Sequence, residues 1–391
     1  MNPYLRKIKK IPAYLWETFN VIVFYPVASL IGKRKNIYLI SERGTDARDN
    51  GYYMFKYIRR QHPELDCHYV IRKDSEDLDR VSKYGNVIAH GSLKHHIFYF
   101  ASKYCISTHL FGYTPNIDFY ARLIRRGMFA RKKMVSLRHG VTVSDTPSLH
   151  AEKSKLDLVI SSAKPEYDFM LENFHYHPDQ LKYTGLARFD GLHEFTVKNQ
   201  ILVMPTWRSY LYQLNDREFT ESEYYRRWTG FLENPALAQI LKESDMKLVF
   251  YPHYELQKFI RSFQATSRQI IIADKEHYDV QELLKTSKLL ITDFSSVFFD
   301  FAYMNKPCLY YQFDRERFYH EHYGKGYFDH TEMGFGEVCS EEDALICALT
   351  AYIRGGCEMK PVYSSRVADF FRLRDNHNCE RIFDEIKKLA E

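Results

Sequence analysis

The chain has 391 residues, of which 45% are apolar and 27% charged, so it is long enough for two globular domains and is neither disordered nor fibrous. Its seven cysteines are scattered, without the dense pattern of a disulfide scaffold or the close spacing of a metal site. The net charge of +5 is concentrated in residues 1–35, which carry seven basic residues and one acidic residue.

Residues 1–35 are predicted to form a basic amphipathic segment that associates with a membrane surface. An apolar run from Phe19 to Ile31 lies between two basic clusters. This run is shorter than the roughly 20 residues that a membrane-spanning helix needs. Trp16 is a ring type favoured at the lipid headgroup level, and Lys and Arg attract anionic lipid. The alternative is a helix that packs on the body of the protein and leaves its lysines in solvent.

A second basic stretch follows in the N-terminal half and is predicted to meet an anionic surface or polymer. Its first three arginines have the spacing of one helix face, and the set is Arg122, Arg125, Arg126, Arg131, Lys132 and Lys133. The alternative is a solvated helix face. No recognised nucleic-acid-binding module accompanies the charge, so nucleic acid is not the expected partner.

After residue 35, short apolar runs alternate with helical stretches, which predicts parallel sheets covered by helices on both faces. The first series of expected strands is Asn36–Ser41, His68–Ile71, Asn86–Ala89, Tyr104–Thr108, Met134–Leu137 and Leu156–Ser161. The second series is Ile201–Pro205, Lys247–Tyr251, Gln269–Ala273, Leu289–Thr292 and Cys308–Gln312. The fold class is therefore α/β, with Rossmann-like domains at 36–190 and 191–391. Two such domains that face each other across a cleft define the GT-B architecture.

Ligands of open α/β sheets bind where strands end and helices begin, so polar residues at those points are candidate site residues. After the strand 289–292, the hydroxyls and free backbone N–H groups around Thr292, Asp293, Ser295 and Ser296 could cradle a phosphate. The alternative there is an ordinary helix cap. No dinucleotide-binding or P-loop glycine fingerprint occurs in either half, which argues against dehydrogenases and P-loop enzymes.

Other strand ends carry residues suited to acid–base chemistry or to phosphate binding. His139 follows a strand and precedes Gly140, and an imidazole is suited to general base catalysis near neutral pH. Arg208 offers a fork of donors that matches phosphate oxygens. The remaining candidates are His253, Thr206, Asp329 and Glu332. No cluster with metal-ligand spacing is evident, so no metal or cofactor is expected to be required, although a divalent cation could assist.

Together these motifs resemble the CDP-glycerol glycerophosphotransferase family, which makes teichoic acids and related capsule polymers. The resemblance rests on Ser41–Gly44 with Asp49–Asn50, His139–Gly140, Thr184–Asp190, Met204–Arg208, Ile291–Asp300, Gly326–Asp329 with Glu332–Met333, and Asp375 with Arg381–Ile382. The sequence departs from the family pattern at Val141–Val143, at Ala187 and at Gly334–Gly336. These departures lie mostly on the acceptor side, so the acceptor is less certain than the phosphotransfer.

The resemblance implies a peripheral enzyme on the cytoplasmic face of the cell membrane, with a GT-B fold. It would transfer glycerol phosphate or ribitol phosphate from CDP-glycerol or CDP-ribitol to a hydroxyl of a lipid-linked polymer and release CMP. His139 would be the general base, and His253 a second catalytic histidine that helps bind the pyrophosphate. The donor would be bound by Thr206, Arg208, Thr292, Asp293, Ser295, Ser296, Asp329 and Glu332. The alternative is a GT-B glycosyltransferase that uses a nucleotide sugar.

Overall fold

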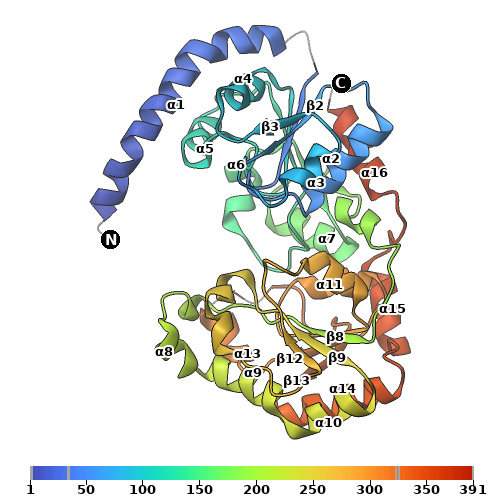
Figure 1. The fold of residues 1–391 in the computed structure, drawn as a ribbon. Coiled ribbons are helices and arrows are strands. Elements are labelled where there is room, and N and C mark those ends of the chain that lie inside the picture. The colour runs from blue at the N-terminus through green and yellow to red at the C-terminus, as the bar shows by residue number, and fades with distance from the viewer. Residues whose placement is uncertain (1–2, 33–35, 322–323, 325, 390–391) are drawn as a thin grey trace. The chain divides into compact units, whose positions relative to one another are not determined.

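The structure, a computed structural model, describes residues 3–32, 36–321, 324 and 326–389. It divides into two compact units (Figure 1). The first unit holds the chain up to Val141, then Thr146–Gly191 and the C-terminal stretch from Asp375. The second unit holds Thr142–Asp145 and Leu192–Arg374.

The first unit is built on a seven-stranded sheet in which every pairing is parallel, with the order β3-β2-β1-β4-β5-β6-β7. Its elements are α1 (Pro3–Gly32), β1 (Tyr38–Ser41), α2 (Asn50–Gln61), β2 (Cys67–Ile71), α3 (Leu78–Ser82), β3 (Val87–Ala89), α4 (Leu93–Ala101), β4 (Tyr104–Ser107), α5 (Ile117–Arg125), β5 (Lys133–Ser136), η1 (Pro147–Leu149), α6 (Ala151–Ser154), β6 (Leu158–Ser161), α7 (Lys164–Asn173), β7 (Leu181–Tyr183), η2 (Ala187–Gly191) and α16 (Asn378–Lys388).

The second unit is built on a six-stranded sheet, also parallel throughout, with the order β10-β9-β8-β11-β12-β13. Its elements are β8 (Gln200–Val203), η3 (Ser209–Leu211), α8 (Asp216–Thr220), α9 (Glu223–Glu233), α10 (Pro235–Glu243), β9 (Lys247–Phe250), η4 (Tyr254–Ser262), β10 (Ile270–Ile272), α11 (Val280–Thr286), β11 (Leu289–Thr292), α12 (Val297–Tyr303), β12 (Cys308–Tyr311), α13 (Arg315–Glu321), β13 (Gly336–Cys339), α14 (Glu342–Arg354) and α15 (Pro361–Phe370).

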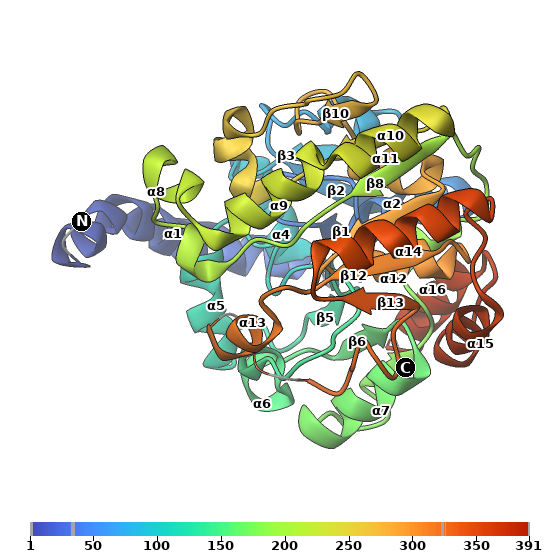
Figure 2. The same cartoon turned by 90° about the horizontal axis from the view of Figure 1, so that it is seen from below.

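Each sheet has an apolar core on its faces, as continuous apolar strands require. In the first unit one core joins the sheet to α1, α4, α5 and α7, and a separate core joins the opposite face to α2 and α16. In the second unit α9, α10 and α14 cover one face of the sheet around the buried Trp228 (Figure 2). The expected α/β class with two Rossmann-like halves is therefore confirmed.

The C-terminal residues belong to the first unit, whereas the sequence analysis had placed all of 191–391 in the second domain. Ile382, Phe383 and Ile386 of α16 are buried in a core of the first sheet. Asp190 reinforces this contact by accepting hydrogen bonds from the backbone N–H groups of Asn378, at 2.9 Å, and Cys379, at 2.8 Å. The apolar face of α16 thus decides its place, and this face is not visible from its position along the chain.

Helix α1 packs against α4 in the first unit (Figure 1), and two of its polar residues are buried. Glu17 is buried and lies 2.9 Å from His96 Nε2. Asn20 is also buried and donates to the carbonyl of Trp16 at 2.8 Å. No helix among the described residues has both the length and the hydropathy needed to cross a bilayer. Lys33–Lys35 of the predicted basic segment lie outside the described residues.

Candidate active site

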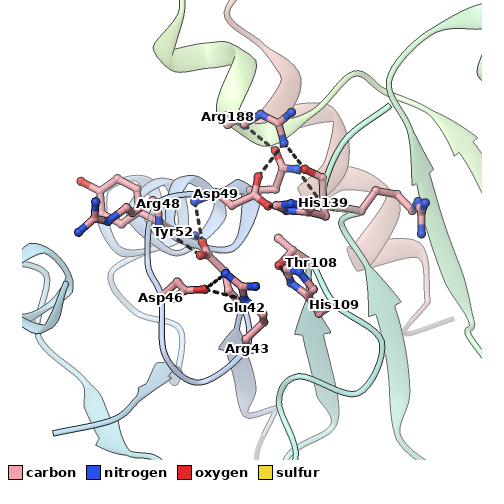
Figure 3. A network of polar contacts seen from close by, with 12 residues as sticks. Glu42, Arg43, Asp46, Arg48, Asp49, Tyr52, Thr108, His109, His139 and Arg188 are labelled. Atoms are coloured by element: carbon pink, nitrogen blue, oxygen red, sulfur yellow. Dashed lines mark hydrogen bonds and ion pairs between the residues drawn. The ribbon is translucent and has the colours of Figure 1, made fainter. Parts of the chain in front are cut away.

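The strand order of the first sheet reverses between β1 and β4, and polar residues gather where these strands end (Figure 3). Glu42 directly follows β1, and Thr108 and His109 directly follow β4. His139 comes three residues after the end of β5, the next strand in the sheet. Such a reversal is where open α/β sheets bind ligands. The fold therefore places His139 at the edge where sheets of this class bind their ligands.

Asp49 connects His139 to Arg188. One Asp49 carboxylate oxygen lies 2.5 Å from His139 Nδ1, and the other accepts a hydrogen bond from Arg188 at 2.7 Å (Figure 3). Arg188 also donates to the His139 carbonyl at 2.5 Å. Burial opposes ionisation of Asp49, but the charges of Arg188 and His139 outweigh it and hold the pKa of this carboxyl well below its usual range. Asp49 is therefore ionised at neutral pH.

An ionised carboxylate at Nδ1 fixes the tautomer of the imidazole. Nδ1 carries the proton toward Asp49, and Nε2 is left as the basic nitrogen. The His139 side chain is 68% exposed, whereas that of Asp49 is only 12% exposed, so the imidazole reaches solvent from a buried support. This is the arrangement of a general base held in orientation by a carboxylate.

Two further features hold His139 in place. Arg138, directly before it, has the left-handed backbone angle φ 58°, an uncommon conformation for a residue with a side chain. The Asn50 side chain donates to the Arg138 carbonyl at 2.8 Å and accepts from the Arg188 N–H at 2.9 Å. Asn50 therefore ties the loop that carries His139 to the segment that carries Arg188.

Glu42 fixes the position of Asp49 through hydrogen bonds to the backbone. Its buried carboxylate accepts the backbone N–H groups of Arg48 at 3.1 Å, Asp49 at 2.8 Å and Tyr52 at 3.0 Å, at the start of α2. Burial raises the pKa of Glu42 to about 7, and the charge of Asp49 acts in the same direction. Glu42 thus provides the helix cap, while Asp49, at the N-cap position, is left to contact His139.

A second imidazole lies beside the first. The ring centroids of His109 and His139 are 4.7 Å apart, and His109 Nδ1 lies 2.9 Å from the Thr108 hydroxyl. Burial, followed by the nearby charges of His139 and Arg43, lowers the pKa of His109 to about 4. His109 is therefore neutral at physiological pH. His109 was not predicted from the sequence, and Asp49 and Arg188 were given no role, because only the folded chain brings these residues together with His139.

The second unit has an equivalent reversal between β8 and β11, and it carries several of the predicted donor-binding residues. The Thr292 hydroxyl donates to the Met204 carbonyl at 2.7 Å, and the Thr206 N–H donates to Asp293 at 2.8 Å. Thr292 and Asp293 are fully buried and serve to join these two strand ends. The Thr206 hydroxyl is buried and has no hydrogen-bond partner among the described residues.

Arg208 does not present its guanidinium to a ligand, which corrects its assignment as a phosphate-binding side chain. The residue is fully buried and binds Asp314 through two hydrogen bonds, of 2.8 and 2.9 Å. It also forms an ion pair with Asp293 at 2.9 Å and donates to the Thr206 carbonyl at 2.8 Å. Because these partners occupy the guanidinium, Arg208 holds the strand ends together from inside the unit.

The other predicted donor-side residues are more accessible, except Ser295. Ser295 is buried, whereas Ser296, at the N-cap of α12, is exposed and its side chain makes no capping bond. His253 caps η4 by accepting from the Glu255 N–H at 3.2 Å. Asp329 accepts the N–H groups of Thr331 and Glu332 and pairs with Arg315 at 2.7 Å. The structure places Glu332 in solvent.

The basic stretch is only partly on the surface. Arg122, Arg125, Arg126 and Arg131 are exposed, and Lys133 is half-buried. Lys132 is buried and donates to the backbone carbonyls of Tyr99, Phe100 and Ser102 at the end of α4. Its assignment as a membrane or acceptor contact is therefore corrected: it caps a helix. Burial lowers the pKa of its ammonium group to about 8.

Among the described residues, one group could hold a metal ion, namely His150, Glu152 and His175 in the first unit. Linear spacing did not reveal this group because its members come from two segments.

Comparison with known proteins identifies the family. Residues 23–388 match the profile of the family described as CDP-Glycerol:Poly(glycerophosphate) glycerophosphotransferase. The chain belongs to this family. It is 32% identical over 370 residues to the minor teichoic acid biosynthesis protein GgaB of Bacillus subtilis (strain 168), covering 92% of this chain and 40% of GgaB.

Two other relatives are named as enzymes of teichoic acid synthesis. The teichoic acid glycerol-phosphate transferase of Staphylococcus aureus (strain NCTC 8325 / PS 47) is 25% identical over 61% of this chain and 62% of its own length. The teichoic acid poly(glycerol phosphate) polymerase of B. subtilis (strain 168) is 21% identical over 98% of this chain and 53% of its own length. The chain thus spans roughly half the length of these curated relatives.

Solved structures agree on the fold. The H548A form of the wall teichoic acid polymerase TagF superimposes with a TM-score of 0.71 at 17% identity, covering 99% of this chain and 98% of that chain. A putative UDP-N-acetylglucosamine 2-epimerase from Listeria monocytogenes gives a TM-score of 0.58 at 14% identity, covering 91% and 96%. These superpositions establish the GT-B fold of this family member. At such low identities they say nothing about its chemistry, which has to be argued from the residues of this chain.

The burial of Arg208 with its two carboxylate partners leads to a prediction about the stability of the fold. Arg208→Ala leaves Asp293 and Asp314 buried without their cation, so we expect the free energy of unfolding to fall by about 3–5 kcal/mol. Arg217→Ala is the matched control, because the Arg217 side chain is 88% exposed in its ion pair with Glu221; we expect a change within about 0.5 kcal/mol. Denaturant unfolding measures both variants. Equal stabilities for the two variants would contradict the structural role of Arg208.

Glu42 makes a prediction about pH. Its pKa rises from 4.5 in the unfolded chain to about 7 in the folded protein. The folded state therefore holds this proton more tightly, and the resulting stabilisation is present below pH 4.5 and lost as the pH rises through 7. Glu42→Gln cannot lose a proton, so we expect its stability relative to the wild type to increase between pH 5 and 8, by at most about 3 kcal/mol. Urea unfolding across this pH range tests the prediction. If the free energies of unfolding of the wild type and of Glu42→Gln changed in parallel with pH, the prediction would be refuted.

Proposed function

We propose that this chain transfers a phosphoalditol, glycerol phosphate or ribitol phosphate, from a CDP-alditol to a hydroxyl of a lipid-linked teichoic-acid-like or capsule polymer. The family assignment supports this proposal, because the family is described by transfer from CDP-glycerol to poly(glycerophosphate). The observation that carries it is the exposed imidazole of His139 on the buried Asp49–Arg188 pair. Activating an acceptor hydroxyl requires such a base.

In the proposed reaction, His139 Nε2 takes the proton of the acceptor hydroxyl as its oxygen attacks the β-phosphorus of the donor. A new P–O bond forms, the bond to the bridging pyrophosphate oxygen breaks, and CMP leaves. Asp49 keeps the imidazole oriented and stabilises the imidazolium that forms. Arg188 keeps Asp49 ionised. His109, neutral and 4.7 Å away, adds no charge that would oppose protonation of His139.

We assign donor binding to the polar strand ends of the second unit. The unpartnered Thr206 hydroxyl and the exposed Ser296 are groups that a donor could engage, with His253, Ser295, Asp329 and Glu332 nearby in sequence or on neighbouring loops. Arg208, Asp293 and Thr292 would support these groups by fixing the strand ends. No cofactor is part of this proposal, and a chelator should leave the transfer intact.

We further propose that α1 rests on the cytoplasmic face of an anionic membrane. One face of α1 carries exposed apolar side chains: Ile11, Leu15, Trp16, Phe19, Ile22, Val23, Val27 and Leu30 are each at least 42% exposed. The inner face of the same helix buries the polar Glu17 and Asn20 together with Ala28. Apolar side chains with basic residues alongside match a lipid–water interface.

The first experiment measures CMP released from CDP-glycerol or CDP-ribitol, with and without a short lipid-linked acceptor. We expect acceptor-dependent CMP, and His139→Ala should reduce its rate by roughly 10²–10⁴-fold, as loss of a general base does. Asp49→Asn should lose at least tenfold, since the imidazole would no longer be held in one tautomer. Turnover of a nucleotide sugar with no CMP from either CDP-alditol would favour a glycosyltransferase.

His177→Ala serves as the control in this assay, because His177 is an exposed histidine 3.2 Å from Asp179 that precedes strand β7, whereas His139 follows strand β5. It should retain wild-type CMP release. If His139→Ala also stays within about threefold of the wild type, His139 is not the base.

The membrane proposal predicts that Ile22→Asp with Val27→Asp weakens binding to vesicles that contain phosphatidylglycerol. These side chains are 68% and 60% exposed, so the substitutions should leave the fold intact. Each loses the burial of an aliphatic side chain in lipid, roughly 1.5–3 kcal/mol, and we expect at least a tenfold loss of vesicle partitioning. Vesicle co-sedimentation measures the loss, and Val362→Asp, an exposed apolar residue of α15, is the control. Unchanged partitioning, or self-association of the wild type through this face, would overturn the proposal.

A further inference from the structure

His150, Glu152 and His175 form a cluster of ligating side chains outside the site described above. One atom from each, an imidazole nitrogen or a carboxylate oxygen, lies within 4.8 Å of the other two. His150 Nδ1 is 3.6 Å from one Glu152 oxygen, and His175 Nδ1 is 3.6 Å from the other. Two imidazoles and a carboxylate are a ligand set that proteins use for zinc.

The separations suit an ion better than direct hydrogen bonds. Both 3.6 Å distances are longer than a good N–H···O hydrogen bond. Zinc with bonds of about 2.0–2.1 Å in a tetrahedron needs ligand atoms about 3.3–3.4 Å apart. A small rotation of side chains would reach this spacing. Glu152 and His175 are free to make it, since their side chains are 53% and 67% exposed.

The backbone beneath the cluster is already braced. The cluster joins the start of α6 to the segment after α7, and the Ala151 N–H donates to the Phe174 carbonyl at 2.9 Å across them. The buried Tyr176 hydroxyl donates to the Leu149 carbonyl and lies 2.9 Å from the Ser154 hydroxyl. The two segments are therefore held in register without the ligands, so an ion would meet ligands that are already close together.

We propose that His150, Glu152 and His175 bind a divalent transition-metal ion of the zinc class, one per chain. The hard cations Mg²⁺ and Ca²⁺ prefer all-oxygen ligand sets and would bind here poorly. Three protein ligands leave a fourth position for water. The ion would clasp the start of α6 to the segment after α7, at the far end of the loop that begins at His139. This site is independent of the proposed phosphotransfer.

The test is zinc binding to the full chain, purified and stripped of metal, by competition with a chromophoric chelator. We expect one tight site, with His150→Ala and His175→Ala each weakening it by at least roughly 10–100-fold, the loss seen when even an outer-shell partner is removed. Cobalt(II) should give the intense visible absorption of a tetrahedral site, and either substitution should abolish it. Magnesium should not compete at a hundredfold excess.

His177→Ala is the matched control, a neighbouring exposed histidine paired with a carboxylate but outside the cluster. It should leave affinity and spectrum unchanged. Circular dichroism of each variant shows that lost binding is not lost folding. The proposal is overturned if the stripped chain binds no zinc, or if His177→Ala weakens binding as much as His150→Ala does. CMP release measured beside binding separates this outcome from failure of the transferase proposal.

Discussion

The buried carboxylate of Asp49 must be compensated, and much of the first unit is arranged around that requirement. A buried charge is stable only when it is paired and hydrogen-bonded. Asp49 meets this condition through Arg188 on one oxygen and His139 on the other. The two partners come from η2 and from the loop after β5, so a single side chain joins three strand-end segments. The exposed imidazole of His139 is held in place because the buried Asp49 carboxylate would lose its compensating partners if it moved away.

The second unit meets the same physical constraint with the opposite sign of buried charge. There the buried group is the Arg208 cation, and Asp293 and Asp314 compensate it from the ends of β11 and β12. Three aromatic rings surround the guanidinium, with Phe318 the nearest at 4.8 Å. The guanidinium N–H groups of Arg208 bind buried acceptors within the unit, so this network has no group that faces solvent. The network around Asp49 instead ends in a group that reaches solvent.

Sequence patterns predicted the strands that contain a clear apolar run, including the edge strands β3 and β10, and missed two others. Leu289–Thr292 was predicted to the residue because each position is apolar or β-branched. β7 (Leu181–Tyr183) and β13 (Gly336–Cys339) were missed, since both are short edge strands that include polar residues or glycine. The place of α16 was missed because chain order says nothing about which core an apolar helix face joins.

The candidate site was predictable at the level of residue type and not at the level of partners. His139 stood out because it follows a strand, but nothing in the linear sequence connects it to Asp49, ninety positions away. Arg208 and Lys132 were assigned to ligands for their charge, whereas each meets buried acceptors supplied by distant segments. The sequence therefore identifies a basic side chain as a hydrogen-bond donor, but only the folded structure shows which acceptor it contacts.

Helix α1 shows the same limit for a surface. Its sequence from Phe19 to Ile31 is apolar almost throughout, so composition could not say which side faces the protein. The fold answers through two polar side chains: Glu17 contacts His96, and the buried Asn20 lies on the same side. These two polar residues and Ala28 lie on the inner face that attaches the helix to its unit, while the large apolar residues of the outer face stay exposed. A contiguous exposed apolar face marks an interaction surface, and this is the physical basis of the proposed contact of α1 with lipid.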